Sequence, residues 1–295
     1  PDRIVVTTGS SGAFVLAFLA AFDAGDRVAL AAPGYPCYRN ILSALGIRPV
    51  SLMTTAADRF QPTPALLDRA LADGPLDGLI VASPSNPTGT MLDHDTFRDL
   101  AAYCREKGIR LISDEIYHGI TFGRKADSAL SFTSDALIVN SFSKYFSMTG
   151  WRLGWMVVPA ELARAIECLS QNLFISPPAL SQIAGIAALE CREEIDRNVA
   201  GYARSRALLL EALPRAGFDH LAPADGAFYL YADISKLTND SEAFCRRMLA
   251  ETGVAATPGI DFDPERGHTF MRFSFSRSTA EMNAAAEALI AWQPR

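Results

Sequence analysis

Short apolar runs alternate with longer segments of helical periodicity from the start of the chain to about Pro159. The runs predict strands near residues 4–8, 27–32, 48–54, 78–82, 110–114, 136–140 and 153–158. The segments between them predict helices near 12–22, 37–45, 64–72 and 95–107, and the third is expected to begin with Thr63 as N-cap and Pro64 as first residue. This alternation is typical of an α/β fold with a mostly parallel sheet and helices on both faces.

The pattern changes after Pro178, where one apolar stripe predicts a single long helix that runs to about Leu213 and bridges two domains. The stripe consists of Leu180, Ile183, Ala184 and Ala187. Farther along, the sequence predicts strands near 227–232 and 269–276 and a helix near 241–251. We therefore predict a large domain over residues 1–205 and a smaller α+β domain over residues 206–295.

The second domain is expected to end in a helix with a recognisable start. Ser278 and Glu281 have the spacing of a capping box, in which each side chain bonds to the backbone N–H of the other residue. The predicted buried stripe of this helix is formed by Met282, Ala285, Ala286 and Leu289.

Composition and charge narrow the possible functions. The 295 residues carry a net charge of −6 without a run of like charge, so we expect neither nucleic acid nor a membrane as partner. The apolar runs are shorter than the roughly 20 residues that cross a bilayer. The five cysteines form no CxxC pair, so we expect no disulfide framework, no metal site and a cytoplasmic location. Because Pro1 leads at once into an apolar run, we also expect that the natural chain has a further segment before it.

Candidate chemistry lies just past the predicted strands, because open parallel sheets bind ligands at the carboxyl ends of their strands. The small and polar residues at 8–12 expose backbone N–H groups that suit a phosphate, although such a sequence also forms simple tight turns. Asp114 is either a helix N-cap or a carboxylate aimed at a ligand cation. Lys144 and Arg152 follow the next strand, where each is either a solvated surface charge or part of a site. In the second domain, strand alternation places Arg272 on the face opposite Met271 and Phe273.

Taken together and in this order, these segments resemble one protein family. The run SFSKYFSMTGWRLGW at 141–155, with SPSNPTG at 83–89 and SDEIY at 113–117, resembles the class I and II aminotransferases, which are fold-type-I enzymes dependent on pyridoxal 5′-phosphate. The likeness extends from PDRIVVTTGSSGA at the start to MRFSFSR at 271–277.

The resemblance implies a role for each matching residue. Lys144 matches the lysine that forms the Schiff base, and Asp114 matches the carboxylate that holds the pyridine nitrogen protonated. Tyr117 and Asn86 match the residues that bond to the phenolic oxygen, and Tyr35 matches an aromatic ring stacked on the cofactor. The positions that match the phosphate cradle are Gly9, Ser10, Ser11, Ser141 and Arg152.

Substrate recognition follows from the same resemblance. Arg272 matches the arginine that binds the α-carboxylate of the substrate, with Asn86 beside it. A planar guanidinium suits the two oxygens of a carboxylate, so lysine would be a poor replacement there. We also expect Arg152 to lower the pKa of Lys144 and Asp114 to stay ionised beside a cationic ring.

The predicted activity is transfer of an amino group between an L-amino acid and a 2-oxo acid in two half-reactions, by a homodimer when full length. Two alternatives stay open, because a fold does not fix a reaction. The first is a pyridoxal-phosphate lyase acting on carbon–sulfur bonds, and the second is the aminotransferase-like sensor domain of a transcription regulator. The sequence does not identify the side chain of the substrate.

Overall fold

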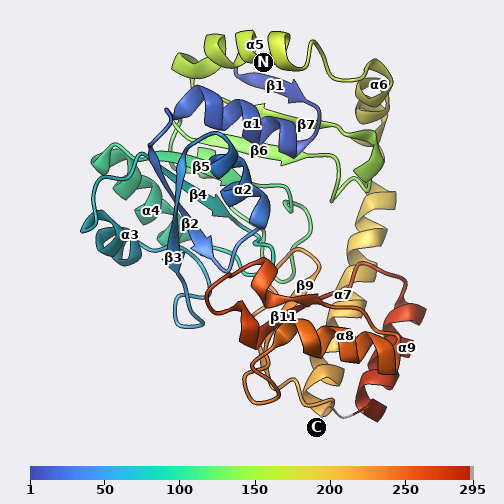
Figure 1. The fold of residues 1–295 in the computed structure, drawn as a ribbon. Coiled ribbons are helices and arrows are strands. Elements are labelled where there is room, and N and C mark those ends of the chain that lie inside the picture. The colour runs from blue at the N-terminus through green and yellow to red at the C-terminus, as the bar shows by residue number, and fades with distance from the viewer. Residues whose placement is uncertain (293–295) are drawn as a thin grey trace.

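A computed structural model describes residues 1–292 and consists of a large α/β unit followed by a smaller one (Figure 1). The last three residues of the predicted second domain, 293–295, lie outside the described residues. The large unit is built on a seven-stranded sheet of order β1-β7-β6-β5-β4-β2-β3. Only β7 runs antiparallel to its neighbours in this sheet, so the other strands share one direction. The strands are β1 Ile4–Thr7, β2 Arg27–Ala32, β3 Arg48–Met53, β4 Gly78–Ala82, β5 Arg110–Asp114, β6 Leu137–Ser141 and β7 Gly154–Val157.

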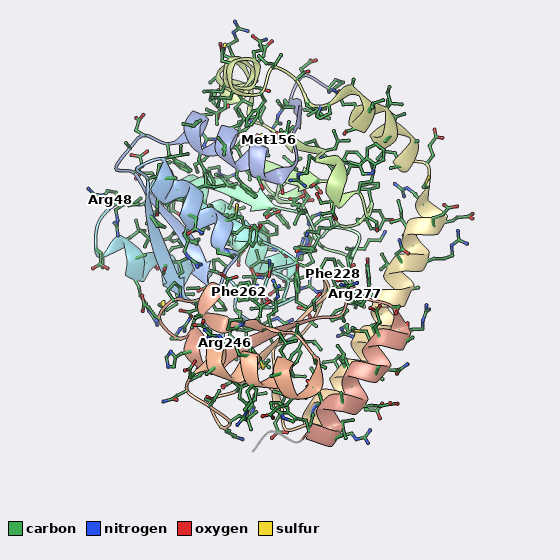
Figure 2. All side chains as sticks on the ribbon, turned by 45° about the vertical axis from the view of Figure 1, so that its right-hand side comes forward. Arg48, Met156, Phe228, Arg246, Phe262 and Arg277 are labelled. Carbon is green, nitrogen blue, oxygen red and sulfur yellow. The ribbon has the colours of Figure 1, made fainter. Side chains whose placement is uncertain are left out.

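Helices cover both faces of this sheet, as the alternating pattern predicted. On β4, Ile80 packs in a core with α1, α2 and α5, whereas its neighbours Leu79 and Val81 pack on the other side with α3 and α4. Met156 of β7 belongs to the first core, beneath α1 (Figure 2). Buried apolar side chains on both faces explain why these strands read as continuous hydrophobic runs. The helices are α1 Ser10–Ala21, α2 Pro36–Ala44, α3 Pro64–Leu71, α4 His94–Lys107 and α5 Ala160–Leu173.

The smaller unit has an antiparallel sheet of order β10-β11-β9-β8, packed against α7, α8 and α9 (Figure 1). The predicted capping box of the last helix is confirmed, because Ser278 N–H donates to Glu281 and Glu281 N–H donates to Ser278 Oγ. Of the predicted stripe, Met282, Ala286 and Leu289 are buried. The elements are α7 Arg192–Arg215, β8 His220–Leu221, β9 Tyr229–Asp233, α8 Ser241–Thr252, β10 Thr257–Pro258, β11 Phe270–Ser274 and α9 Thr279–Trp292. Short 3-10 helices lie at Ala129–Ser131, Thr149–Trp151, Gly259–Asp261 and Gly267–Thr269.

The prediction of one continuous helix from Pro178 to Leu213 is wrong. The chain forms α6 Ala179–Ala188 and then α7, with a break between them. In the break, the N–H groups of Glu190 and Cys191 donate to carbonyls only three residues back, which tightens and ends the turn. Glu193 and Glu194 in the first turn of α7 then favour a new helix start.

The large apolar side chains of the predicted stripe on α6 are exposed and do not pack against the protein. Leu180 and Ile183 are 76% and 65% exposed, and the buried side is formed by Ser181 and Gly185. A Cβ on Gly185 would lie 2.6 Å from Leu153, so the helix approaches the body of the protein through its smallest residues. The sequence prediction omitted α5 and the two-residue strands β8 and β10.

Candidate functional site

The site is a cavity of about 250 Å³ at the carboxyl ends of the parallel strands, where it is closed by the inner face of the small sheet. Asp114 ends β5, and the segments that follow β1, β2, β4 and β6 supply most other side chains. Tyr229 of β9 and Arg272 of β11 come from the small sheet. The lining residues are Ser10, Ser11, Tyr35, Tyr38, Ala82, Asn86, Asp114, Ile116, Tyr117, Ser143, Lys144, Thr149, Arg152, Tyr229 and Arg272.

One end of the cavity is built for an anion. Ser10 and Ser11 form the first turn of α1, whose N-cap Gly9 has no side chain to bond the free N–H groups. A Cβ on Gly9 would lie 2.7 Å from a terminal nitrogen of Arg152, so only glycine lets this guanidinium lie against the turn. Arg152 donates to the carbonyl of Thr149 and is in no ion pair within residues 1–292. A helix N-terminus and a guanidinium without a carboxylate partner together attract a phosphate.

A buried carboxylate also lines the cavity. Asp114 is 4% exposed, accepts the Ile116 N–H at 3.1 Å and accepts the hydroxyl of Tyr38. Burial raises the pKa of Asp114 from 3.8 to about 6, and the two hydrogen bonds oppose that rise. Neighbouring Glu115 raises this pKa further, and Lys144 lowers it. Burial makes the ionised form of Asp114 unfavourable, so a ligand that brings its own positive charge would stabilise this carboxylate.

Lys144 lines the same cavity. Its Nζ is 5.9 Å from the ring centroids of both Tyr117 and Phe228. Burial is the main cause that lowers the pKa of Lys144, followed by the charge of Arg272, and Arg152 contributes less. The expected effect of Arg152 is therefore present, but sequence reasoning missed the two larger causes. A lysine with a lowered pKa has more of the neutral, nucleophilic amine near neutral pH.

Arg272 forms the wall on the side of the small domain. Its guanidinium lies between two rings, 4.3 Å from the centroid of Tyr229 and 4.8 Å from that of Phe262, which lies at the junction of the two domains (Figure 2). It donates to Asn86 Oδ1 at 2.7 Å and to Thr257 Oγ1 at 3.2 Å. Its Nε is buried and has no partner within residues 1–292. A guanidinium has five N–H donors, so Arg272 has donors left for the carboxylate of a substrate.

The predicted site residues are distributed in and around this cavity. Nine line it, namely Ser10, Ser11, Tyr35, Asn86, Asp114, Tyr117, Lys144, Arg152 and Arg272. Gly9 lies behind Arg152, and Ser141 is buried behind the lining, where its Oγ is 2.8 Å from that of Ser143. Sequence reasoning missed Tyr38, Ser143, Thr149 and Tyr229. Tyr229 lies in a strand that the sequence predicted, but only the pairing of this strand with that of Arg272 brings it to the cavity.

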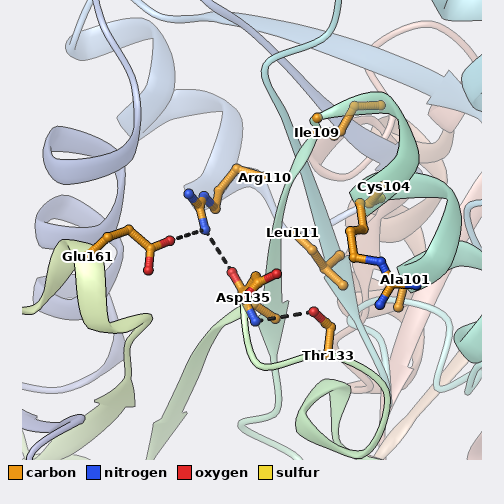
Figure 3. A pocket seen from close by; sticks show the side chains of 11 residues that line it. Ala101, Cys104, Ile109, Arg110, Leu111, Thr133, Asp135 and Glu161 are labelled. Atoms are coloured by element: carbon orange, nitrogen blue, oxygen red, sulfur yellow. Dashed lines mark hydrogen bonds and ion pairs between the residues drawn. The ribbon is translucent and has the colours of Figure 1, made fainter.

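Another cavity, of about 200 Å³, lies at the opposite end of β5 (Figure 3). Two cations and two carboxylates line it, Arg105, Arg110, Asp135 and Glu161, and the guanidinium of Arg110 already donates to Glu161 at 3.1 Å and to the carbonyl of Asp135 at 2.9 Å. A paired cation at the amino end of a strand offers little to a ligand. Within residues 1–292 no group of three or more metal-binding side chains is positioned to hold a metal ion. Across the same residues, every helix is too short or too polar to span a bilayer.

Comparison with known proteins identifies the family of the chain. Residues 1–289 match the family model of class I and II aminotransferases. The chain is 53% identical to a valine–pyruvate aminotransferase from Mycobacterium tuberculosis, over 100% of this chain and 76% of that protein. It superposes on the crystal structure of an aminotransferase from Mycobacterium tuberculosis with a TM-score of 0.96, at 53% identity over 100% of this chain and 76% of the other. The TM-score is 0.90 for the aspartate aminotransferase from Thermus thermophilus with maleate, at 32% identity over 99% and 76% of the two chains.

Proposed function

The chain belongs to the class I and II aminotransferases, pyridoxal-phosphate-dependent enzymes that move an amino group between an amino acid and a 2-oxo acid, and we propose that the cavity around Lys144 is where it does so. The observation that carries this proposal is the set of charged groups that line one cavity. An anion site, an amine, a buried carboxylate and a second guanidinium lie around one space of about 250 Å³. The names of the relatives favour transamination over the carbon–sulfur lyase and the regulator domain.

The residues present fit the cofactor. Its phosphate needs a cationic cradle, and Arg152 lies against the start of α1 without a carboxylate partner within residues 1–292. Its pyridine nitrogen needs a charge partner, and Asp114 is buried with no cation within ion-pair distance among the described residues. Each group would therefore gain the partner that it lacks.

Within this assignment, the chain's own residues divide the work. When bound, pyridoxal phosphate supplies an aldehyde that takes up the amino group and a ring that accepts the electrons released at Cα. Lys144 Nζ would hold the cofactor at rest and, once released, remove the proton from Cα of the amino acid. Asp114 would keep the ring nitrogen protonated, and the hydroxyl of Tyr117 would donate to the phenolic oxygen.

Arg272 would orient the substrate for that proton transfer. Two aromatic rings and the bond to Asn86 fix the guanidinium, so a carboxylate meets a preorganised donor. Fixing the α-carboxylate there sets the position of Cα relative to Lys144. Tyr35 would cover the ring from the side of α2, with Tyr38 behind it.

For the substrate, we propose a small neutral amino acid with pyruvate as the oxo acid. The cavity lining contains three cations, Lys144, Arg152 and Arg272, and each already has a role in this assignment. The described lining therefore has no spare cation for a second carboxylate. The name of the relative that shares 53% identity, valine–pyruvate aminotransferase, supports the same choice.

The assembly proposed is a homodimer that uses the exposed face of α6. Leu180, Ile183 and Ile186 on this helix and Leu189 at its C-cap are 54–76% exposed, although they are among the most apolar side chains of the protein. A continuous apolar surface of this kind marks an interaction site. We also propose that the boundary between the two domains lies within α7, near residue 205. The five cysteines form no disulfide, which supports the proposal that the protein is cytoplasmic.

The test is to locate the cofactor and then measure the donor range. Borohydride treatment of the holoprotein should attach the cofactor irreversibly to the peptide that contains Lys144, and Lys144→Ala should abolish the attachment. Lys107→Ala, which removes an exposed lysine far from the cavity, is the matched control. Attachment to another lysine would overturn the site. With pyruvate as the amino acceptor, a panel of amino donors should favour valine over aspartate, and preference for aspartate with 2-oxoglutarate would overturn the substrate class.

A further inference from the structure

Tyr229 touches both halves of the site. Its hydroxyl lies 2.7 Å from the hydroxyl of Tyr117, and the face of its ring lies 4.3 Å from the guanidinium carbon of Arg272. Tyr229 is 5% exposed, so both contacts are shielded from water. No other residue of the cavity lining both bonds to Tyr117 and stacks on Arg272 within the part of the chain that the structure describes.

Strand register explains why one residue reaches both partners. Tyr229 is opposite Ser274 in the antiparallel pair of β9 and β11, so Arg272 is its diagonal neighbour on the same face of the sheet. The ring meets that of Tyr117 edge to face, with centroids 5.7 Å apart, and this contact aims the two hydroxyls at each other.

We infer that Tyr229 is a positioning residue with two separable parts, a hydroxyl that makes Tyr117 a stronger hydrogen-bond donor and a ring that fixes Arg272 for the substrate carboxylate. The inference deepens the proposed function and rests on it. When Tyr117 donates its own proton to the phenolic oxygen of the cofactor, its oxygen is free to accept the proton of Tyr229. Hydrogen bonds in such a chain strengthen one another.

The hydroxyl part predicts a change in the spectrum of the holoprotein. A stronger donor stabilises negative charge on the phenolic oxygen, so the proton at the neighbouring Lys144 nitrogen leaves at lower pH. Tyr229→Phe should raise the pH midpoint of the visible absorption change by about half a unit. The other charged and titratable groups facing this tyrosine pair are Asp114, Lys144, Arg272, Tyr35 and Tyr38, and all of them remain in the variant.

The chain offers a matched control. Tyr231 lies two residues farther along the same strand and is equally buried, but its hydroxyl has no hydrogen-bond partner within residues 1–292. Tyr231→Phe should leave the midpoint unchanged, whereas Tyr117→Phe should raise it more than Tyr229→Phe does. The double variant at 117 and 229 should match Tyr117→Phe alone, because the second hydroxyl acts through the first.

The ring part predicts a change in substrate binding. We would titrate the holoprotein with 2-methylalanine, which has the α-carboxylate but no hydrogen on Cα, and follow the spectrum. Tyr229→Phe keeps the ring and should bind within about twofold of the parent, whereas Tyr229→Leu should bind about tenfold more weakly.

The outcomes separate the two levels of the argument. If Tyr117→Phe does not shift the midpoint, the proposed role of Tyr117 is wrong and this inference is lost with it. If Tyr117→Phe shifts it and Tyr229→Phe behaves like Tyr231→Phe, only the hydroxyl part is overturned. Unchanged binding by Tyr229→Leu would overturn the ring part.

Discussion

Replacing Asp114 by asparagine should make the apoprotein more stable at the same time as it removes most of the turnover. The side chains have almost the same shape, so the cavity should be preserved. Asparagine can still accept the Ile116 N–H through its oxygen, and its amide can donate to the hydroxyl oxygen of Tyr38. What changes is the charge, which in the wild type is buried without a cationic partner.

The size of the effect follows from the pKa of Asp114, which burial raises from 3.8 to about 6. A change of about two units corresponds to about 3 kcal/mol. The folded state holds the proton to a higher pH than the unfolded chain does, so the wild type loses this stability as the pH rises from about 4 to about 6. Asp114→Asn should therefore equal the wild type near pH 4 and exceed it by up to about 3 kcal/mol above pH 6.

Urea unfolding of the apoproteins at pH 4.5 and pH 8 measures this difference. Asp93→Asn is the control, because hydrogen bonds from Thr96 lower the pKa of the exposed Asp93 carboxyl, and that variant should not gain stability at pH 8. A stability difference for Asp114→Asn that is the same at both pH values would refute the reasoning. Near-normal turnover by the holoenzyme would show that Asp114 has only a structural role.

Three further predictions concern the rest of the molecule. Arg272→Lys should raise KM for every amino acid tested, because all share the α-carboxylate, and steady-state kinetics with several donors will show whether the loss is uniform. Burial raises the pKa of Glu115 from 4.5 to about 7. In the same urea assay, Glu115→Gln should therefore become more stable than the wild type by up to about 3 kcal/mol as the pH rises from 5 to 8, because the glutamine oxygen can still accept from Ser128 and Ala129 but carries no charge. Ile183→Asp should convert a dimer into monomers by light scattering, and an unchanged mass would exclude this face of α6.

The sequence predicted the seven strands of the large sheet well because side chains on both faces of the sheet are buried, and it predicted α3 and α4 well because both helices have clear end signals. Thr63 accepts the N–H of Leu66 as the predicted N-cap, and Gly108 ends α4 in the left-handed conformation. The break after Ala188 could not be predicted from the apolar stripe. Helical periodicity continues across it, whereas the orientation of α6 depends on the contact between Gly185 and Leu153, which lie far apart in the sequence.

The site residues that sequence reasoning missed share a different cause. Tyr38 and Tyr229 belong to no motif that marks chemistry, and each also reads as an ordinary core aromatic. Their importance comes from what they touch, Asp114 in one case and Tyr117 with Arg272 in the other. The hydrogen bond between Tyr38 and Asp114 joins residues 76 positions apart, and the one between Tyr229 and Tyr117 joins residues 112 positions apart. Only the folded chain therefore reveals these contacts.

The structural costs of this fold are concentrated around the cavity. Burial acts against the charged forms of both Asp114 and Lys144, Arg272 has a buried nitrogen without a partner within residues 1–292, and Arg152 has the left-handed φ of 50°. None of these features stabilises the apoprotein, and the charges and the unpartnered nitrogen are placed where an anionic phosphate, a cationic ring or a carboxylate would offset them. Because binding would relieve these costs, their relief adds to the free energy of binding, and the holoprotein should gain more stability from the cofactor than the same contacts would give at a site without them. The charges that are unfavourable in the apoprotein are the same charges that would position the reacting atoms.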